Sequence, residues 1–288
     1  MRDEIRLEAP AKINLALHVL GKRPDGYHDL VTVFHRLNLC DELRLVRTHS
    51  PGISIRCPEG GAPEGPENLA CRAAAVFFER TGVAPELFIE LHKNIPTAAG
   101  LGGGSSDAAS VLLGLNRLFG ERLESESLIE LGMDLGADVP FFLWEVAGAV
   151  GEGRGDRIRP VSIPEGTYIL VNPGFPVSTA WAYASLDQAR GNFELTKVQN
   201  APIRQILNHS SFQASALLHN DLEEVTLKRF PVISQIKRTL LNLGCDGALM
   251  SGSGPTVFGY FSNRSRAEEA YRTLKRETAF SCFLTRSY

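Results

Sequence analysis

The stretch PTAAGLGGGSSDAAS, residues 96–110, constrains the fold more than any other part of the chain. It holds four glycines in five positions, Gly100 and residues 102–104, and then turns polar and finally apolar. Glycine loses more freedom on folding than any other residue, so such a cluster indicates a sharp turn or a close approach to the backbone. The preceding ELFIELHKNIP reads as a strand, and the following SSDAASVLLGLNRLFG has helical periodicity. The sequence therefore predicts a strand, a glycine turn and a helix in succession.

A glycine turn that opens a helix points backbone N–H groups and the positive end of the helix dipole at one place, which favours an anion. We expect Ser105 or Ser106 to cap this helix and Gly120 to end it. The common phosphate fingerprints GxxxxGK[ST], GxGxxG, HRD and DFG are absent. A phosphate chain is the favoured ligand, and a flexible loop without a ligand is the alternative. The predicted apolar face of the helix consists of Ala108, Leu112, Leu115 and Phe119.

Composition narrows the class of protein. The chain has 288 residues, 43% of them hydrophobic, which is enough for two domains, and we expect their boundary near residue 158. A net charge of −3 without a basic cluster argues against a nucleic-acid partner. The N-terminus does not resemble a signal peptide, and no apolar run is long enough to span a membrane. Five cysteines without a CxxC pair indicate a reduced, cytoplasmic chain with neither disulfides nor a zinc site.

The rest of the pattern alternates between strands and helices. Residues 5–21 have strand periodicity, KRPDGYH supplies a turn, and a second strand resumes over 29–39. Helices are expected over 69–82 and 127–136, and ADVPFFL enters a buried region. Beyond residue 160 the predicted elements are GTYILVNPG, VISQIKRTLLNLG, PTVFGYF and SRAEEAYRTLKRE. In the first strand, Ile13, Leu15, Leu17 and Val19 share one face, and Lys12, Asn14, Ala16 and His18 share the other.

Several of these stretches together resemble a known superfamily. PTAAGLGGGSSDAA is similar to the glycine-rich motif of the GHMP kinases, which include galactokinase, homoserine kinase, mevalonate kinase and phosphomevalonate kinase. GALMSGSGPTVFG, residues 247–259, resembles their third motif. AKINLALHVLGKRPDGYHDL (11–30) and GADVPFFL (136–143) narrow the resemblance to the members that phosphorylate 4-diphosphocytidyl-2-C-methyl-D-erythritol. The motifs extend over nearly the whole chain.

The resemblance implies an α+β protein with the GHMP kinase fold. Residues 1–158 would form an S5-domain-2-like domain and residues 159–288 a ferredoxin-like domain. The implied reaction moves the γ-phosphate of ATP to the 2-hydroxyl of 4-diphosphocytidyl-2-C-methylerythritol, on the non-mevalonate route to isoprenoids, with Mg²⁺ expected beside ATP. The expected partner is a small molecule with a cytidine diphosphate handle rather than a nucleic acid or membrane. The chain would act as a monomer or a homodimer.

Two residues carry the chemistry that the resemblance implies. By local pattern alone, Lys12 reads as an exposed strand lysine or as a buried lysine that needs a partner. Asp138 reads equally well as a helix N-cap. The resemblance makes Asp138 the base that takes the proton of the attacking hydroxyl, and it makes Lys12 the cation that keeps this carboxylate ionised.

The same resemblance assigns the ATP site. Asn68 matches an asparagine that contacts the nucleotide, although an ordinary helix N-cap is an equal alternative, and Lys93 is a weaker candidate. Ser105 or Ser106 is the one hydroxyl we expect near Mg²⁺, and no metal ligands are assigned. The predicted phosphate-binding residues are Pro96, Thr97, Ala98, Ala99, Gly100, Leu101, Gly102, Gly103, Gly104, Ser105 and Ser106.

The cytidine site is expected around the PDGYH turn and the stretch NPGFPVSTAWAY. His28 and Tyr183 are expected to sandwich or flank the base. SGSGPT, residues 251–256, is either a second anion cradle or a tight turn before a strand. The residues that the resemblance places at the substrate are Asn14, Tyr27, His28, Thr179 and Tyr183.

Three other functions compete with this interpretation. A homoserine or mevalonate kinase is disfavoured by PDGYH and by the chain length. A GHMP-fold binding protein without activity is disfavoured because Lys12 and Asp138 are both present. A dinucleotide-binding oxidoreductase is disfavoured because GxGxxG is absent.

Overall fold

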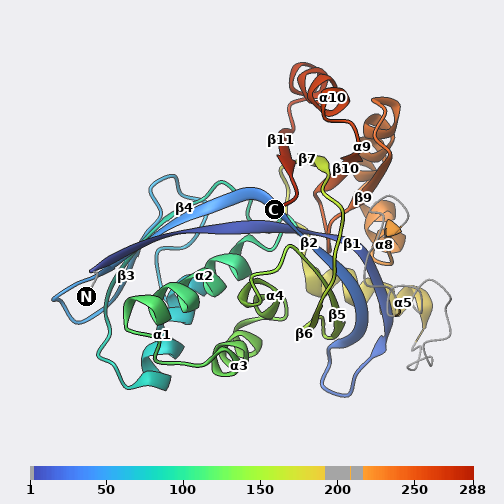
Figure 1. The fold of residues 1–288 in the computed structure, drawn as a ribbon. Helices are drawn as coiled ribbons and strands as arrows, with labels where there is room; N and C mark the ends of the chain where they lie inside the picture. The colour runs from blue at the N-terminus through green and yellow to red at the C-terminus, as the bar shows by residue number, and fades with distance from the viewer. Residues whose placement is uncertain (1–2, 192–207, 209–216) are drawn as a thin grey trace. The chain divides into compact units, whose positions relative to one another are not determined.

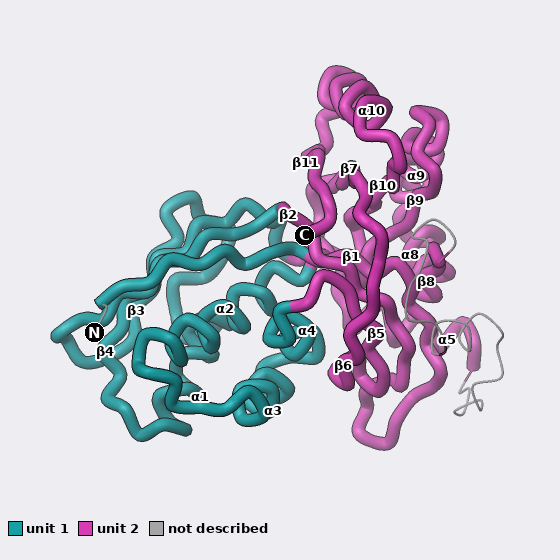
Figure 2. Tube along the Cα trace, viewed as in Figure 1, with its two compact units in different colours: residues 1–11, 39–97, 102–145 teal, residues 12–38, 98–101, 146–288 magenta. Residues whose placement is uncertain are grey.

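The structure is a computed structural model that describes residues 3–191, 208 and 217–288. Contacts within the chain divide it into two compact units (Figure 2). Unit 1 comprises Met1–Ala11, Leu39–Thr97 and Gly102–Glu145, and unit 2 comprises Lys12–Asn38, Ala98–Leu101 and Val146–Tyr288. Both units are discontinuous in sequence, and the domain boundary near residue 158 stays a prediction. The glycine turn contributes residues 98–101 to unit 2 and the following residues to unit 1.

Unit 1 is a sheet with helices on one face (Figure 1). Its strand order is β3-β4-β2-β1, in which β3 runs parallel to β4, and β4 runs antiparallel to β2. The strands β1 and β2 also contribute residues to unit 2. The elements of unit 1 are β1 (Glu4–Lys22), β2 (His28–Arg47), β3 (Gly52–Arg56), α1 (Leu69–Thr81), β4 (Glu86–His92), α2 (Gly103–Leu118), α3 (Ser125–Leu135) and α4 (Val139–Leu143).

The helix α2 lies tight against this sheet. A side chain at Gly114 would place its Cβ 2.4 Å from Cδ1 of Leu7 and 2.7 Å from Cδ1 of Leu45. Glycine at this position therefore permits the close approach of helix and sheet, which outweighs its poor helix propensity. The predicted apolar face is confirmed, because Ala108, Leu112, Leu115 and Phe119 are all buried.

Unit 2 contains strands of the same seven-stranded sheet and a second sheet of four strands. In the first, β1 runs parallel to β8, and β2 runs antiparallel to β5, which pairs with β6. The second is antiparallel with the order β11-β7-β10-β9, as expected for a ferredoxin-like half. The further elements of unit 2 are β5 (Gly148–Gly153), β6 (Arg157–Pro160), β7 (Thr167–Asn172), α5 (Thr179–Arg190), β8 (His219–Asn220), α8 (Glu223–Arg229), α9 (Pro231–Asn242), β9 (Gly247–Met250), β10 (Val257–Phe261), α10 (Arg264–Glu277) and β11 (Ser281–Arg286).

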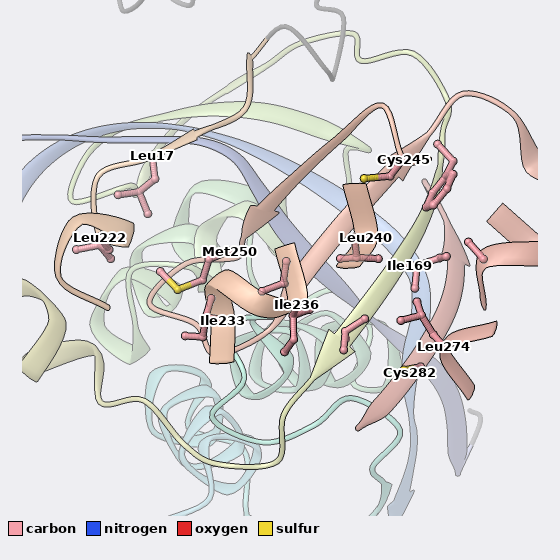
Figure 3. Packing of buried hydrophobic residues seen from close by; sticks show 14 of the residues in the cluster. Leu17, Ile169, Leu222, Ile233, Ile236, Leu240, Cys245, Met250, Leu274 and Cys282 are labelled. Carbon is pink, nitrogen blue, oxygen red and sulfur yellow. The ribbon is translucent and has the colours of Figure 1, made fainter. Parts of the chain in front are cut away.

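The core of unit 2 gathers apolar side chains from strands and helices far apart in the sequence (Figure 3). Ile169 on β7 and Met250 on β9 meet Ile233, Ile236 and Leu240 from α9. These side chains are at most 4% exposed, so the second sheet and its helices form a close-packed core. The turn between β9 and β10 is thereby held on a rigid support.

The predicted elements are largely confirmed, and the exceptions have physical causes. In β1 both faces are buried around Lys12 and Asn14, so the alternative of an exposed strand lysine is wrong. The hairpin of β5 and β6 was not predicted, because GAVGEG lacks the alternation that marks a strand. No helix in the described part of the chain combines the length and apolar character that crossing a bilayer requires.

Candidate active site

The helix α2 begins without a side-chain cap. Its N-cap is Gly102, in the left-handed region with φ of 72°, and its first turn carries no acidic residue. The prediction that Ser105 or Ser106 caps the helix is wrong, because the chain becomes helical directly after Gly102. The first N–H groups of a helix have no acceptor within it. This end of α2 therefore offers backbone donors and a positive dipole to an anion.

Two side chains behind this helix start contain buried polar atoms that lack partners. Among the described residues, Oγ of Ser106 and Oδ1 of Asp107 are buried and make no hydrogen bond. A buried hydroxyl ordinarily finds a partner, so an unsatisfied one next to bare helix amides fits a ligand that arrives with oxygen atoms. The residues present thus fit a phosphate group.

The first half of the glycine turn packs against the protein itself. Gly100 has φ of 77°, and a Cβ there would lie 2.2 Å from the carbonyl oxygen of Ser251. Oγ of Ser251 donates to the carbonyl of Gly100 at 2.9 Å, and the amide of Lys12 donates to the carbonyl of Leu101 at 2.9 Å. What comes close to the backbone at Gly100 is therefore the turn at residues 251–254.

Gly103 differs from Gly100 and Gly102. Its φ is not in the left-handed region, so its backbone conformation does not exclude a side chain. A Cβ at Gly103 would instead lie 3.1 Å from Cγ2 of Ile95 and 3.3 Å from Nζ of Lys93. Substitution at Gly103 would disturb the support beneath the helix as well as any ligand above it.

A buried ionic cluster lies beneath the start of α2. Nζ of Lys93 donates to Oδ2 of Asp41, and it donates to Oδ2 of Asp107 at 2.7 Å. Oδ1 of Asp41 also accepts from the amides of Asn94 and Ile95, at 2.6 and 2.8 Å. The ammonium of Lys93, the weaker nucleotide candidate, is thus engaged by two carboxylates that the sequence pattern did not bring together.

The cluster holds two carboxylates and one ammonium, so one carboxylate charge is poorly compensated. Burial, together with the charge of Asp41, raises the pKa of Asp107, although Lys93 opposes this shift. The pKa of Lys93 is also raised, because the two carboxylates outweigh its own burial. Asp41 holds three donors, whereas Oδ1 of Asp107 holds none, so the charge of Asp107 is the less well compensated of the two.

Asn68 and Thr97 have structural partners. Oδ1 of Asn68 accepts from the amide of Ala70 at 2.9 Å and so caps α1, and its Nδ2 donates to the carbonyl of Pro63 at 2.7 Å. The hydroxyl of Thr97 donates to the carbonyl of Gly61. The N-cap role of Asn68 is confirmed, and its contact with a nucleotide stays a prediction.

Lys12 heads a buried chain of hydrogen bonds in unit 2. Its Nζ donates to Oδ1 of Asn14 at 2.8 Å, and Nδ2 of Asn14 donates to the hydroxyl of Thr32 at 2.8 Å. Thr32 donates in turn to the carbonyl of Ala16 at 2.7 Å. Lys12 is 4% exposed, and its ammonium lies over the ring of Phe34. Asn14, predicted at the substrate, thereby fixes the orientation of the lysine.

Asp138 stands at the N-cap position of α4 in unit 1. Its side chain makes no capping hydrogen bond, so the interpretation of Asp138 as a capping residue is wrong. The helix that follows is buried, with Val139 and Phe141 fully inaccessible. The buried apolar side chains of α4 therefore hold the backbone at Asp138 in place. The pairing of Asp138 with Lys12 stays a prediction.

His28 and Tyr183 come together in unit 2. Their rings stack with centroids 4.8 Å apart and 26° between planes. Rings already in stacking contact leave no space for a third ring between them. A base would flank this pair, and a sandwich would require the two rings to separate.

The other predicted substrate residues have contacts of their own. The exposed ring of Tyr27 lies under the guanidinium of Arg154, at 4.9 Å. The hydroxyl of Thr179, at the start of α5, lies 2.9 Å from that of Ser253. The residues that sequence reasoning missed are Thr32, Asp41, Asp107 and Asp187, and their roles depend on contacts between distant segments.

Comparison with known proteins identifies the family. Residues 68–145 match the model of the GHMP kinases N terminal domain, and residues 203–279 match that of the GHMP kinases C terminal domain. The 4-diphosphocytidyl-2-C-methyl-D-erythritol kinase of Geotalea daltonii is 46% identical over 95% of this chain and 95% of its own length. The same kinase of Geobacter sp. strain M21 is 47% identical with the same coverage. The chain belongs to the 4-diphosphocytidyl-2-C-methyl-D-erythritol kinase family.

Solved structures agree with this assignment. A crystal structure of a 4-(cytidine 5'-diphospho)-2C-methyl-D-erythritol kinase matches with a TM-score of 0.81 and 35% identity, covering 99% of this chain and 100% of that chain. The homoserine kinase of Cytophaga hutchinsonii matches with a TM-score of 0.71 and 18% identity, covering 100% of this chain and 95% of that chain. The second likeness shows the fold alone, and the predicted α+β GHMP kinase fold is confirmed.

Proposed function

We infer that the chain is an ATP-dependent kinase of isoprenoid precursor synthesis. It transfers the γ-phosphoryl group of ATP to the 2-hydroxyl of 4-diphosphocytidyl-2-C-methyl-D-erythritol. Its family membership supports this reaction. The structural observation that carries it is the uncapped start of α2, with bare amides and the unpartnered hydroxyl of Ser106.

The amides at the start of α2 hold the phosphates of ATP. The backbone donors of Gly103, Gly104 and Ser105 are fixed by the helix, so they need no reorganisation as charge shifts toward the β-phosphate. Asp138 takes the proton of the attacking hydroxyl, and Lys12 offsets charge on the transferring group. Positioning and electrostatics suffice, and no phosphorylated enzyme is formed.

Mg²⁺ is expected to accompany ATP. Phosphate and hydroxyl oxygens are the ligands this cation prefers, and the buried Oγ of Ser106 fits that chemistry. When bound, the ion neutralises phosphate charge. Among the described residues, the one cluster of three potential side-chain ligands is His18, His219 and Asp221. That cluster already engages Arg190 and the amide of Val19 through Asp221, so we do not assign Mg²⁺ to it.

A substrate panel tests the function directly. ATP consumption is measured with the diphosphocytidyl substrate, homoserine and mevalonate in parallel. We expect turnover with the first and background rates with the others. Equal turnover with mevalonate or homoserine would assign the chain to another branch of the superfamily.

The role of Asp138 is tested by Asp138→Asn, which keeps shape and removes the base. We expect kcat to fall by about 10² to 10⁴, as general-base loss does, with a smaller change in substrate KM. Asp134→Asn is the matched control, because Asp134 is an exposed carboxylate of α3 in the same unit. A near-normal kcat in Asp138→Asn would exclude it as the base.

Lys12→Met extends this test to the pairing of the two residues. If Lys12 acts through Asp138, the double variant loses much less than the product of the single losses. Multiplicative losses would mean that Lys12 acts on the phosphate independently.

The cellular setting is part of the proposal. We place the enzyme in the cytoplasm as a monomer or a homodimer. All five cysteines are free, and four of them are buried, which suits a reducing compartment. Gel filtration with light scattering measures the oligomeric state.

A further inference from the structure

His28 is held by two side chains from a single face of α5. The rings of His28 and Tyr183 stack, and Oδ1 of Asp187 lies 2.7 Å from Nε2 of His28. Tyr183 and Asp187 are four residues apart on the helix, so they project from the same face. The imidazole is 8% exposed, and both its plane and its in-plane rotation are therefore fixed.

Asp187 reaches the ring as a carboxylate. Its other oxygen, Oδ2, accepts from Nζ of Lys22 at 3.0 Å. Burial works against the charge, but the hydrogen bonds from His28 and Lys22 outweigh it and lower the pKa of Asp187. An ionised carboxylate only accepts hydrogen bonds, so Nε2 of His28 carries the proton that joins the two groups.

The position of that proton decides whether the other ring nitrogen, Nδ1, donates or accepts a hydrogen bond. In a neutral imidazole with its proton on Nε2, Nδ1 is a lone-pair acceptor. Within the part of the chain that the structure describes, the hydrogen bond of the His28 ring is the one between Nε2 and Asp187. In the neutral ring, the contact of Nε2 with Asp187 therefore leaves Nδ1 as an acceptor whose direction is fixed.

An acceptor at this position distinguishes two pyrimidines. Cytosine presents an amino group at C4, which donates, whereas uracil presents a carbonyl there, which accepts. An acceptor fixed in the protein accepts a hydrogen bond from the amino group of cytosine but repels the carbonyl oxygen of uracil. A rigid site of this kind therefore discriminates strongly against uracil.

We propose that Asp187 is a positioning residue for base selection: it holds the proton of His28 on Nε2, so that Nδ1 accepts from the amino group of a cytosine. This inference rests on the proposed function, because it needs a substrate with a cytidine handle. Asp187 acts through His28 and does not touch the substrate.

The first test needs no substitution at Asp187. Protein labelled with ¹⁵N-histidine is examined by NMR near neutral pH, and His28→Gln identifies the signals of His28. We expect a neutral ring with the proton on Nε2. A proton on Nδ1, whether in the other tautomer or in an imidazolium, would overturn the proposal, because Nδ1 would then be a donor.

The second test compares Asp187→Asn with wild type on the cytidine substrate and on its uridine counterpart. The amide can accept from Nε2–H or donate to bare Nε2, so both tautomers become available. We expect the preference for cytidine, as a ratio of kcat/KM values, to fall about tenfold, mainly through KM, with the KM for ATP unchanged. The ¹⁵N signals of His28 should show both tautomers.

The matched control is Asp29→Asn. Asp29 directly follows His28, and its carboxylate pairs with Arg23 at 2.8 Å rather than with the ring. This variant should keep the preference for cytidine. If wild type prefers cytidine and Asp187→Asn keeps both that preference and the Nε2 proton, the role of Asp187 is refuted while the kinase function stands. If wild type phosphorylates neither substrate, the proposed function itself fails.

Discussion

The glycine turn at residues 100–106 and the serine–glycine turn at residues 251–254 have similar compositions but opposite surroundings. Gly104 is exposed and Gly102, Gly103 and Ser105 are half-buried, whereas every residue from 251 to 256 is buried. We call these the helix-starting turn and the strand turn, after the elements that follow them. The first leaves its amides accessible because a helix start has no internal acceptors for them. The amide of Ser251 instead pairs with the carbonyl of Thr256 at 2.9 Å.

The two turns also rest on different supports. Nδ2 of Asn220 donates to the carbonyls of Met250 and Gly252, both at 2.8 Å, so neutral hydrogen bonds hold the strand turn. The helix-starting turn lies over the charged cluster of Lys93 with Asp41 and Asp107. Glycine thus serves packing in the strand turn and at Gly100, and it serves access from Gly102 onward. The burial of SGSGPT argues against a second anion cradle there.

The largest effect is expected for Gly100→Ala, where the helix-starting turn packs against the strand turn. The new Cβ would fall 2.2 Å from the carbonyl oxygen of Ser251, and the left-handed φ of 77° is unfavourable for alanine. We expect the free energy of unfolding to fall by about 2–4 kcal/mol, measured by urea titration.

Gly104→Ala is the matched control for stability. Its Cβ would meet only Cδ1 of Leu69, at an ordinary 3.4 Å, and alanine is the better helix former. We expect no loss of stability. Equal destabilisation by the two substitutions would show that the helix-starting turn does not divide into a packed half at Gly100 and an accessible half at Gly104.

The strand–turn–helix unit was predictable because its signals are local. The glycine run, the apolar face of α2 and the ends of α1 and α3 each depend on neighbouring residues. The contact of Gly100 with Ser251 joins positions 151 residues apart, and the cluster of Asp41, Lys93 and Asp107 joins three separate segments. No periodicity marks such contacts, so the packing role of Gly100 and the support beneath α2 emerged only from the structure.

The cap of α2 illustrates the same limit at short range. Serine is a strong N-cap, and Ser105 and Ser106 stand near the expected helix start. The left-handed Gly102 instead starts the helix directly, and the close packing of Gly100 fixes the approach of the chain. A capping preference of about 1 kcal/mol is outweighed by tertiary contacts.

The second prediction concerns ligand access at the helix-starting turn. In Gly104→Ala a methyl group stands on the accessible side of the first turn, where phosphate oxygens must approach the amides. We expect ATP to bind about tenfold more weakly by calorimetry, or about 1.4 kcal/mol, while adenosine binds as before. An unchanged ATP affinity in the folded variant would remove the helix-starting turn as the phosphate site.

The last prediction concerns the charged cluster of Lys93, Asp41 and Asp107 beneath the helix-starting turn. Its titration should make the stability of this turn, but not of the strand turn, depend on pH. The pKa of Asp107 is raised from 3.8 to about 7, chiefly by burial, so between these values the folded chain holds a proton that the unfolded chain has lost. The contribution of Asp107 to the free energy of unfolding is therefore largest below about pH 4, and it declines as pH rises toward 7. Asp107→Asn has no such titration, so wild type should lose stability relative to the variant over this range. The comparison cancels the contributions of His18 and His35, whose pKa values of about 4 act in the opposite direction.

Hydrogen exchange should show the change at the start of α2, and exchange at residues 251–254 should be the same in both proteins. A difference that is flat with pH, or one that appears equally in the strand turn, would mean that the cluster does not specifically support the helix-starting turn.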